Sequence, residues 1–251
     1  ISPGVQPTCA ANAWSVPSLD VSALADSLSV TITANHADIG GNNATPATVN
    51  VVKDTTAPTV PAVQGWTWGM VPSNGSTSGN NTPVISLSGA AAENSGSIQI
   101  HDNVACSSAQ GASQTIAAGA TTHNDITYAT DGSDDGLIQF YAIATDQYGN
   151  ASSCVDISLS YTLDTVAPTV AITVSPDITG ANQSNYGFSG TCSENGRQVT
   201  VSIGAVIPGV QPTCTANAWS VSGLDVSSLP EGNNTILADH IDVAGNSTTQ
   251  A

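Results

Sequence analysis

The stretch LIQFYAIATDQYGNASSCVDISLSYTLDTVAPTV, at residues 137–170, carries the pattern that decides the fold. In its segment FYAIAT (140–145), successive side chains point to opposite faces, as in a half-buried β-strand. The turn sequence DQYGN (146–150) follows, and VDISLSYTL (155–163) predicts a second strand. The segment DTVAPTV (164–170) then leads out of the hairpin as a linker.

Parts of this stretch recur elsewhere in the chain. The linker returns as DTTAPTV at 54–60, an offset of 164 − 54 = 110 residues. A different motif, PGVQPTC, stands at 3–9 and at 208–214, an offset of 208 − 3 = 205 residues. Fixed spacing of this kind indicates an array of similar structural units. The turn D-x-x-G-N occurs three times, at 38–42, 146–150 and 242–246.

Two alternating types of unit, A and B, account for both offsets. Residues 1–56 are the C-terminal part of a truncated type A domain, and 57–163 are a complete type B domain. Residues 164–251 are a second type A domain that lacks its last strand. Units near ~100 residues with short strands, such as those expected at 82–89 and 97–102, are typical of immunoglobulin-like sandwiches.

The predicted fold class is therefore all-β, with tandem immunoglobulin-like β-sandwich domains in a linear array. A single all-β barrel is the alternative, but it does not account for a linker that recurs at fixed spacing. The abundance of Val, Ile, Thr, Ser, Asn and Gly agrees with many short strands joined by turns.

The charge of the chain narrows the class of protein. Its 251 residues include 19 acids and 2 basic residues, which gives a formal net charge of −17. Nucleic-acid binding needs a basic patch, which two cations do not make, and an anionic membrane surface is disfavoured for the same reason. No stretch reaches the ~18–20 apolar residues of a spanning helix, so no direct membrane insertion is expected of this segment. No signal peptide is present, so the export signal of an exported protein would lie outside this sequence.

At these motifs the chain resembles the tandem bacterial Ig-like repeats of large surface adhesins and biofilm-associated proteins. The resemblance rests on D-x-x-G-N, on the junction D-T-x-A-P-T-V, and on a strand-turn-strand motif SG-x-x-x-EN. The last appears as SGAAAENSGSI (88–98) and SGTCSENGRQV (189–199). The resemblance to these repeats implies a non-catalytic, repetitive stalk on a bacterial surface. The direct partners of such a stalk are neighbouring repeats of the same long chain.

The five cysteines leave one without a partner. Cys106 and Cys154 fall in the type B unit, and Cys192 and Cys214 in the last type A unit, so these are the predicted disulfides. Cys9 is the equivalent of Cys214, and its expected partner belongs to the missing front of its domain. Disulfides indicate an oxidising, extracellular compartment. Buried free thiols are the alternative, whereas a zinc site is disfavoured because no C-x₂-C or clustered His accompanies the cysteines.

Acidic residues that are distant in the sequence should meet at one pole of each domain. In a seven-stranded sandwich the B–C loop, the F–G loop and the entrance to strand A lie at the same end. Here the B–C loop carries the EN motif and the F–G loop carries the D-x-x-G-N motif. The linker Asp stands at the entrance to strand A. Bare carboxylates repel one another, and Ca²⁺ takes several carboxylate oxygens, so structural Ca²⁺ is expected at the junctions. The alternative is that D-x-x-G-N is only a turn and that the linker Asp caps a backbone N–H.

The predicted metal ligands are Asp54, Glu93 and Asp146 for the middle unit, Asp164, Glu194 and Asp242 for the last unit, and Asp38 in the first. Asp131, Asp134 and Asp135, in the E–F turn of the middle unit, should lie toward the last unit and add to its site.

Two tryptophans, Trp66 and Trp68, stand in a Gly/Ser/Asn-rich segment that is unique to type B. They are either an exposed carbohydrate or protein contact or rings that cover the edge of the sandwich. Trp14 and Trp219 are equivalent positions in type A and are expected in the core.

No catalytic constellation is evident in the sequence. His36 and His240 recur before D-x-x-G-N, which favours a role in strand packing. No nucleophile elbow supports a Ser/His/Asp triad, and the acids are explained by their repeat positions. We therefore expect a non-enzymatic stalk or spacer of an extracellular adhesin or fibre on the bacterial cell surface. The alternatives are a segment of a self-assembling filament, in which copies of the chain contact one another, and a carbohydrate-binding module.

Overall fold

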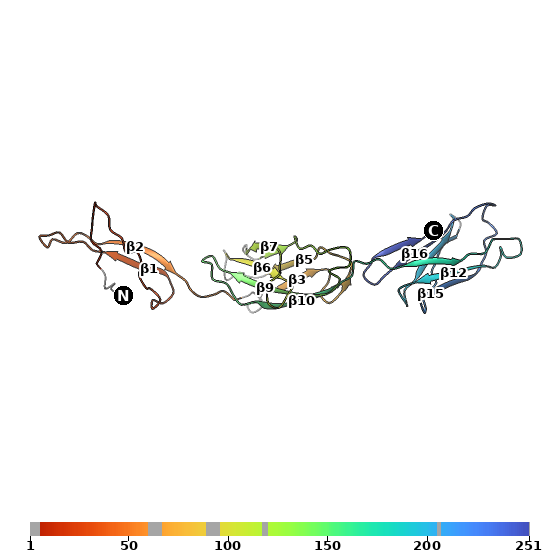
Figure 1. Cartoon of the computed structure of the whole chain (residues 1–251), viewed down its shortest axis with the longest axis horizontal. Helices are drawn as coiled ribbons and strands as arrows, with labels where there is room; N and C mark the ends of the chain where they lie inside the picture. Colours follow the sequence, from red (N-terminus) through yellow and green to blue (C-terminus); the bar gives the residue numbers. More distant parts are fainter. Residues whose placement is uncertain (1–5, 60–66, 89–95, 117–119, 205–206, 251) are drawn as a thin grey trace.

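The computed structural model describes residues 6–59, 67–88, 96–116, 120–204 and 207–250. These residues form strands, turns and loops, and none of them belongs to a helix that could cross a membrane. The strands fall into three sets that follow one another along the long axis of the molecule (Figure 1). The all-β fold class predicted from the sequence is confirmed.

The middle set is a sandwich of two sheets, with strand orders β4-β10-β9-β6-β7 and β3-β5-β8. Neighbouring strands pair antiparallel except for β10 and β4, which are parallel. The strands expected at 82–89, 97–102, 137–145 and 155–163 correspond to β5, β6, β9 and β10. The bounds are β3 (Thr67–Val71), β4 (Thr77–Ser78), β5 (Val84–Ser88), β6 (Ser97–His101), β7 (Ala109–Thr115), β8 (Ala120–His123), β9 (Gly136–Thr145) and β10 (Val155–Leu163).

The hydrophobic core of the middle set follows the alternation seen in the sequence. Along β9 the side chains of Phe140, Ala142 and Ala144 are buried, whereas those between them are only half-buried. The ring of Phe140 stacks on that of Tyr161 in β10, with centroids 6.2 Å apart. The β9–β10 hairpin therefore supplies one wall of the core.

The last set is also a sandwich, with sheets β11-β12-β15 and β14-β13-β16-β17. Phe188 of β12 packs edge-on against Trp219 of β15, with centroids 5.7 Å apart, and Trp219 is only 3% exposed. Val199, Val201 and Ile203 of β13 cover this pair from the other sheet's side of the core. The bounds are β11 (Val170–Val174), β12 (Tyr186–Cys192), β13 (Val199–Ile203), β14 (Ile207–Val210), β15 (Ala218–Leu224), β16 (Ile236–Ile241) and β17 (Ser247–Gln250).

The first set is a single two-stranded sheet of β1 (Ser27–Ala34) and β2 (Ala47–Lys53). Trp14 is 56% exposed, so the expectation that it lies in a core is wrong for this chain. The reason is the absence of a covering strand, because residues 1–56 contain no counterpart of the β12 sequence that packs on Trp219. His36 is likewise exposed, whereas His240 is fully buried.

The two predicted disulfides, Cys106–Cys154 and Cys192–Cys214, are both present, and Cys9 is free and exposed. Each disulfide closes a loop inside one set of strands, of 48 and 22 residues respectively. Neither crosses from one set to another, so each stabilises its own sandwich.

Removal of the second disulfide by the double substitution Cys192→Ser and Cys214→Ser should lower the unfolding free energy of the last sandwich by about 3 kcal/mol. This value follows from the entropy of closing a loop of this length in the unfolded chain. Differential scanning calorimetry should show that one transition moves to a lower temperature while that of the middle sandwich stays in place. A shift of both transitions would show that the sandwiches unfold as one unit. The matched control is Cys106→Ser with Cys154→Ser, which should move the other transition.

Candidate functional site: the inter-domain junctions

The D-x-x-G-N motif forms a closed hydrogen-bonded turn between the last two strands of each set. In the middle sandwich, Oδ1 of Asp146 accepts the backbone N–H groups of Tyr148 (2.8 Å) and Asn150 (2.9 Å). Its Oδ2 accepts the side-chain amide of Asn150 at 2.8 Å. Burial would raise the pKa of Asp146, but these hydrogen bonds together with that of Gly149 lower it below its ordinary value.

The same turn is built in the other two sets. Asp242 accepts the backbone N–H of Asn246 at 2.9 Å and its side-chain amide at 2.9 Å. Asp38 accepts both groups of Asn42 at 2.8 Å, and the side-chain amide is the larger cause of its lowered pKa. The motif carboxylate therefore already has amide donors on both of its oxygens.

In the middle and last sandwiches, the Asn at the end of the motif also holds the linker that enters the sandwich. The side-chain amide of Asn150 donates to the backbone carbonyl of Asp54 at 3.3 Å, and that of Asn246 donates to the carbonyl of Asp164 at 2.6 Å. One amide thus joins the F–G turn to the first linker residue. We call this contact the Asn latch.

The next linker residue, a Thr, is held from the opposite side by the preceding set of strands. The carboxylate of Asp26 accepts the backbone N–H of Thr55 at 3.0 Å and its hydroxyl at 2.9 Å, and also the hydroxyl of Thr56 at 2.8 Å. The Thr55 N–H and the two hydroxyls lower the pKa of Asp26 to about 2. Lys53 lies 3.6 Å from the same carboxylate. We call this contact the Asp clamp.

The second junction repeats the Asp clamp. Asp135 accepts the backbone N–H of Thr165 at 3.0 Å and its hydroxyl at 2.8 Å. Asp26 and Asp135 occupy the same place in their units, immediately before the strands β1 and β9. Each linker is therefore gripped at two adjacent residues, by the preceding unit through a carboxylate and by the following unit through an amide.

The second junction also contains a direct backbone contact between the two sandwiches. The N–H of Gly79, next to β4, donates to the carbonyl of Ala244 in the F–G turn of the last sandwich at 2.9 Å. A Cβ at Gly79 would lie 2.4 Å from Oδ1 of Asn246, so a side chain there would displace the amide that forms the Asn latch. Asp164 joins the same contact because its N–H donates to the carbonyl of Ser78 at 3.1 Å.

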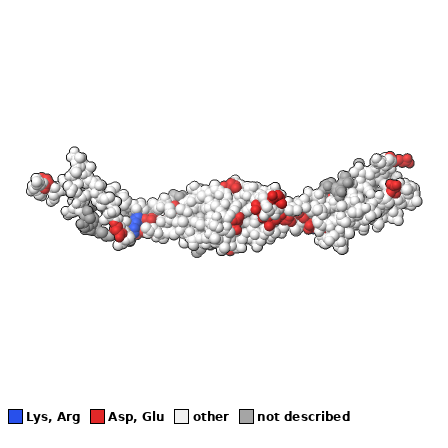
Figure 2. Space-filling view, in the orientation of Figure 1, with Lys and Arg blue, Asp and Glu red and all other residues white. Residues whose placement is uncertain are grey.

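Acidic side chains gather at this second junction. Burial raises the pKa of Asp164, and the charges of Asp242, Asp135 and Glu194 raise it further. These four carboxylates come from the linker, both sandwiches and three different loops. Figure 2 shows acidic surface on the middle unit and along the junction that follows it, with almost no basic surface beside it.

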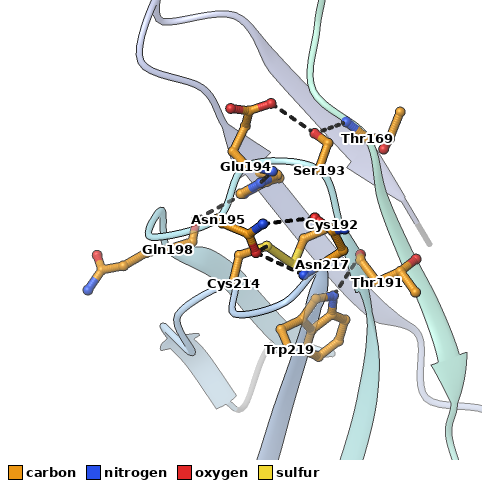
Figure 3. The surroundings of a disulfide bond; sticks show 11 residues. Thr169, Thr191, Cys192, Ser193, Glu194, Asn195, Gln198, Cys214, Asn217 and Trp219 are labelled. Carbon is orange, nitrogen blue, oxygen red and sulfur yellow. Dashed lines mark hydrogen bonds between the residues drawn. A yellow bond between two sulfur atoms is a disulfide. The ribbon is translucent and has the colours of Figure 1, made fainter.

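The B–C loop of the last sandwich holds Glu194 at this pole (Figure 3). Oε1 of Glu194 accepts the hydroxyl of Ser193, whose oxygen in turn accepts the N–H of Thr169 at 3.0 Å. The backbone N–H of Glu194 donates to Nε2 of the buried His240 at 3.2 Å. His240 therefore positions the loop. Its buried ring agrees with the role in strand packing that the sequence favoured.

The remaining predicted ligands have more local roles. Asp54 accepts the N–H of Thr56 at 3.0 Å, while Asp131 and Asp134 accept backbone N–H groups of Ser133 and Ala129 in their own loop. No three His, Cys, Asp or Glu side chains among the described residues are arranged as a ready-made metal site. Glu93 lies outside the described residues.

Trp68 is half-buried and packs against the core of the middle sandwich, together with Met70. This is the edge-covering role that the sequence left open beside a ligand contact. Trp66 lies outside the described residues.

Three contributors to the junctions were missed by sequence reasoning: the clamp residue Asp26, the amides of Asn150 and Asn246, and Gly79. A signal for the first existed, because an Asp stands 29 residues before Thr55 and 30 residues before Thr165. The Asn was visible in every copy of D-x-x-G-N, but its contact with a backbone carbonyl leaves no trace in the sequence.

No family model matches the chain, and no curated protein matches it. Among solved structures it is similar to a tetra-tandem repeat in the extending region of a large adhesion protein. That match has 23% identity and a TM-score of 0.31, and it covers 97% of this chain and 60% of the other. The FN1–FN3 domains of chicken CNTN1 match at 13% identity and a TM-score of 0.28, over 88% of this chain and 76% of the other. The ligand-binding domain of human OSCAR matches at 10% identity and a TM-score of 0.27, over 72% of this chain and 92% of the other.

The substitution Asp135→Ala should loosen the second junction without unfolding either sandwich. It removes the acceptor of two hydrogen bonds from Thr165, together worth roughly 1 kcal/mol at this half-exposed position. Small-angle X-ray scattering should show a wider range of maximum dimensions than for the original chain. Differential scanning calorimetry should show an unchanged unfolding profile. The matched control is Asp134→Ala, since Asp134 is in the same loop and has the same charge but donors within its own loop. Equal scattering of the two variants would contradict the Asp clamp.

Proposed function

We propose that the chain is a structural spacer, a segment of the stalk of an extracellular bacterial adhesin or surface fibre. The observation that carries this proposal is the repeated junction. Two linkers between units of different type are held by the same pair of contacts, an Asp clamp from the preceding unit and an Asn latch from the following one. Such junctions limit bending between neighbouring units. A stalk requires this stiffness, and domains joined by flexible linkers lack it.

Two further features support a role outside the cell. The two intrachain disulfides suit an oxidising compartment. The chain has only Lys53 and Arg197 as basic residues, so trypsin-like proteases find few sites to cut. The proposed role is non-catalytic and concerns distance and stiffness, and the partners on either side are neighbouring Ig-like repeats.

Ca²⁺ binding at the junctions is the finer part of the proposal. The motif residues Asp38, Asp146 and Asp242 already accept amide donors, so they offer only their remaining lone pairs. Asp164 and Glu194 have fewer donors. Burial, and after it the charges of neighbouring carboxylates, raises the pKa of Asp164, and a bound cation would favour its charged form. We therefore propose weak binding in the range ~10⁻⁴–10⁻³ M that is usual for extracellular modules. At the second junction Asp164, Glu194 and Asp135 would provide oxygens, and at the first Asp54 and Asp146, together with Glu93, would do so.

Ca²⁺ at about 1 mM should stiffen the second junction, and chelation with EGTA should loosen it. The physical reason is that the cation neutralises carboxylates that otherwise repel one another across the linker. Small-angle X-ray scattering with and without EGTA should show a narrower distance distribution in Ca²⁺. The double variant Asp164→Asn with Glu194→Gln should lose most of this difference while it remains folded. Identical profiles of the original chain in Ca²⁺ and in EGTA would refute the cation and leave the hydrogen-bonded junction intact.

The stalk also differs from a self-assembling filament in a way that imaging resolves. Negative-stain electron microscopy of the Cys9→Ser chain, in which no disulfide between copies forms through the free thiol, should show isolated thin rods. Sedimentation velocity should give the coefficient of an elongated monomer across a wide range of concentrations. Regular helical fibres with lateral contacts would instead favour the filament.

A further inference from the structure

The first set of strands exposes an apolar surface whose counterpart in the last sandwich is buried. Residues 9–26 match residues 214–231 at an offset of 205, and residues 28–42 match residues 232–246 at an offset of 204. Trp14 is 56% exposed and its equivalent Trp219 is 3% exposed; Val21 is 41% exposed and its equivalent Val226 is 1% exposed. The exposed His36 likewise corresponds to the fully buried His240.

The local backbone of this region is already that of a complete unit. The turn residues Ala11 and Asn12 have φ values of 50° and 63°, and their equivalents Ala216 and Asn217 have 52° and 61°. The same bridge closes both turns, between Ala10 and Ala13 in one copy and between Thr215 and Ala218 in the other. The two copies differ in the strand that follows this turn. Ala218–Leu224 forms β15, whereas the matching residues 13–19 form no strand.

What covers this surface in the last sandwich is a defined three-strand segment: β11, β12 and β13. Trp219 packs against Phe188 of β12 and donates its indole N–H to the carbonyl of Thr191 at 3.1 Å. The N–H of Val226 donates to the carbonyl of Gln183 at 2.7 Å. These partners satisfy both the apolar and the polar groups that Trp14 and Val21 leave exposed in the first set.

Cys9 also points to a partner of this kind, because its equivalent in the last sandwich is disulfide-bonded to β12. Its equivalent, Cys214, is buried and is bonded to Cys192 at the end of β12. All five cysteines lie in the described part of the chain, and Cys9 is the one that is free. A segment seated on the first set as β11–β13 sit in the last sandwich would bring a β12-type cysteine to Cys9.

We propose that residues 6–53 are a docking surface for the three-strand half of a type A unit, a polypeptide segment of the kind found at 165–204. Docking pairs the segment's second strand with residues 13–19, which then become a strand, and buries Trp14 and Val21. It also places the two thiols for a disulfide. In that step each sulfur loses a proton, one S–S bond forms, and two electrons pass to oxidised glutathione, which becomes two reduced glutathione molecules. This inference rests on the exposed surface and not on the proposed stalk function.

The test adds an isotope-labelled synthetic peptide of residues 165–204 to the full chain in a glutathione redox buffer. The label distinguishes the peptide's Cys192 from that of the chain itself. Peptide mapping by mass spectrometry after pepsin digestion should find Cys9 joined to the labelled Cys192. A control peptide with Phe188→Asp and Val201→Asp keeps the thiol but loses the apolar contacts. We expect it to react at least about tenfold more slowly, which corresponds to ~1.4 kcal/mol of docking free energy.

A second measurement removes the covalent step. With Cys9→Ser in the chain and Cys192→Ser in the peptide, the tryptophan fluorescence of the chain should shift to shorter wavelength as Trp14 is buried. The same chain carrying also Trp14→Phe should show no shift. Equal reaction rates of the two peptides, or a Cys9–Cys9 dimer as the dominant product in the presence of peptide, would overturn the proposal. So would an unchanged spectrum.

Discussion

The structure depends on one constraint, which is that the apolar side chains of a β-strand are buried only when partner strands and a second sheet cover them. The chain contains its own comparison, because AWSV occurs at 13–16 and at 218–221. In the second copy the segment is a strand paired with β12, and its Trp219 is buried; in the first copy it forms no strand, and Trp14 is exposed. The turn before it is the same in both copies: an Ala and an Asn have positive φ in each, although the first copy has no covering strands. Turn geometry is thus local here, while strand formation depends on a partner far away in the sequence.

A second consequence concerns how one covered unit is joined to the next. A linker residue exposes its backbone N–H and C=O groups, and in these junctions the neighbouring units satisfy them. The Thr N–H goes to a carboxylate of the preceding unit and the Asp carbonyl to an amide of the following one. The two basic residues of the chain make contacts inside their own units, next to residues of the junctions. Lys53 pairs with the clamp residue Asp26 and contacts the carbonyl of Leu24, while Arg197 donates to the carbonyls of Ile241 and Asp242 beside the F–G turn. Each junction described here thus joins a side chain of one unit to a backbone N–H or C=O group of the linker.

Much of this architecture could be predicted from the sequence, and the failures have physical causes. Alternation along 137–145 and 155–163 gave the hairpin β9–β10, and repeat positions gave both disulfides. The burial of Trp14 was predicted wrongly, because equivalence in sequence carries over to burial only if the covering strands are present. The carboxylates of D-x-x-G-N were read mainly as metal ligands, whereas the structure shows that their first partners are amides of their own turn. Contacts such as Gly79 with Ala244 depend on how two sandwiches meet, and neither residue has a chemical character that would reveal it.

The two kinds of contact at the junction act in opposite directions. The hydrogen bonds of the clamp and latch draw the linker against both units, whereas the charges around Asp164 push the same surfaces apart. In the first junction, hydrogen bonds from Thr55 and Thr56 lower the pKa of the clamp carboxylate of Asp26 to about 2, so its hydrogen bonds persist across neutral pH. The repulsion, in contrast, varies with ionic strength and with any bound cation. In this junction the same residue takes part in both effects, because Asp135 accepts two hydrogen bonds from Thr165 and its charge also raises the pKa of Asp164.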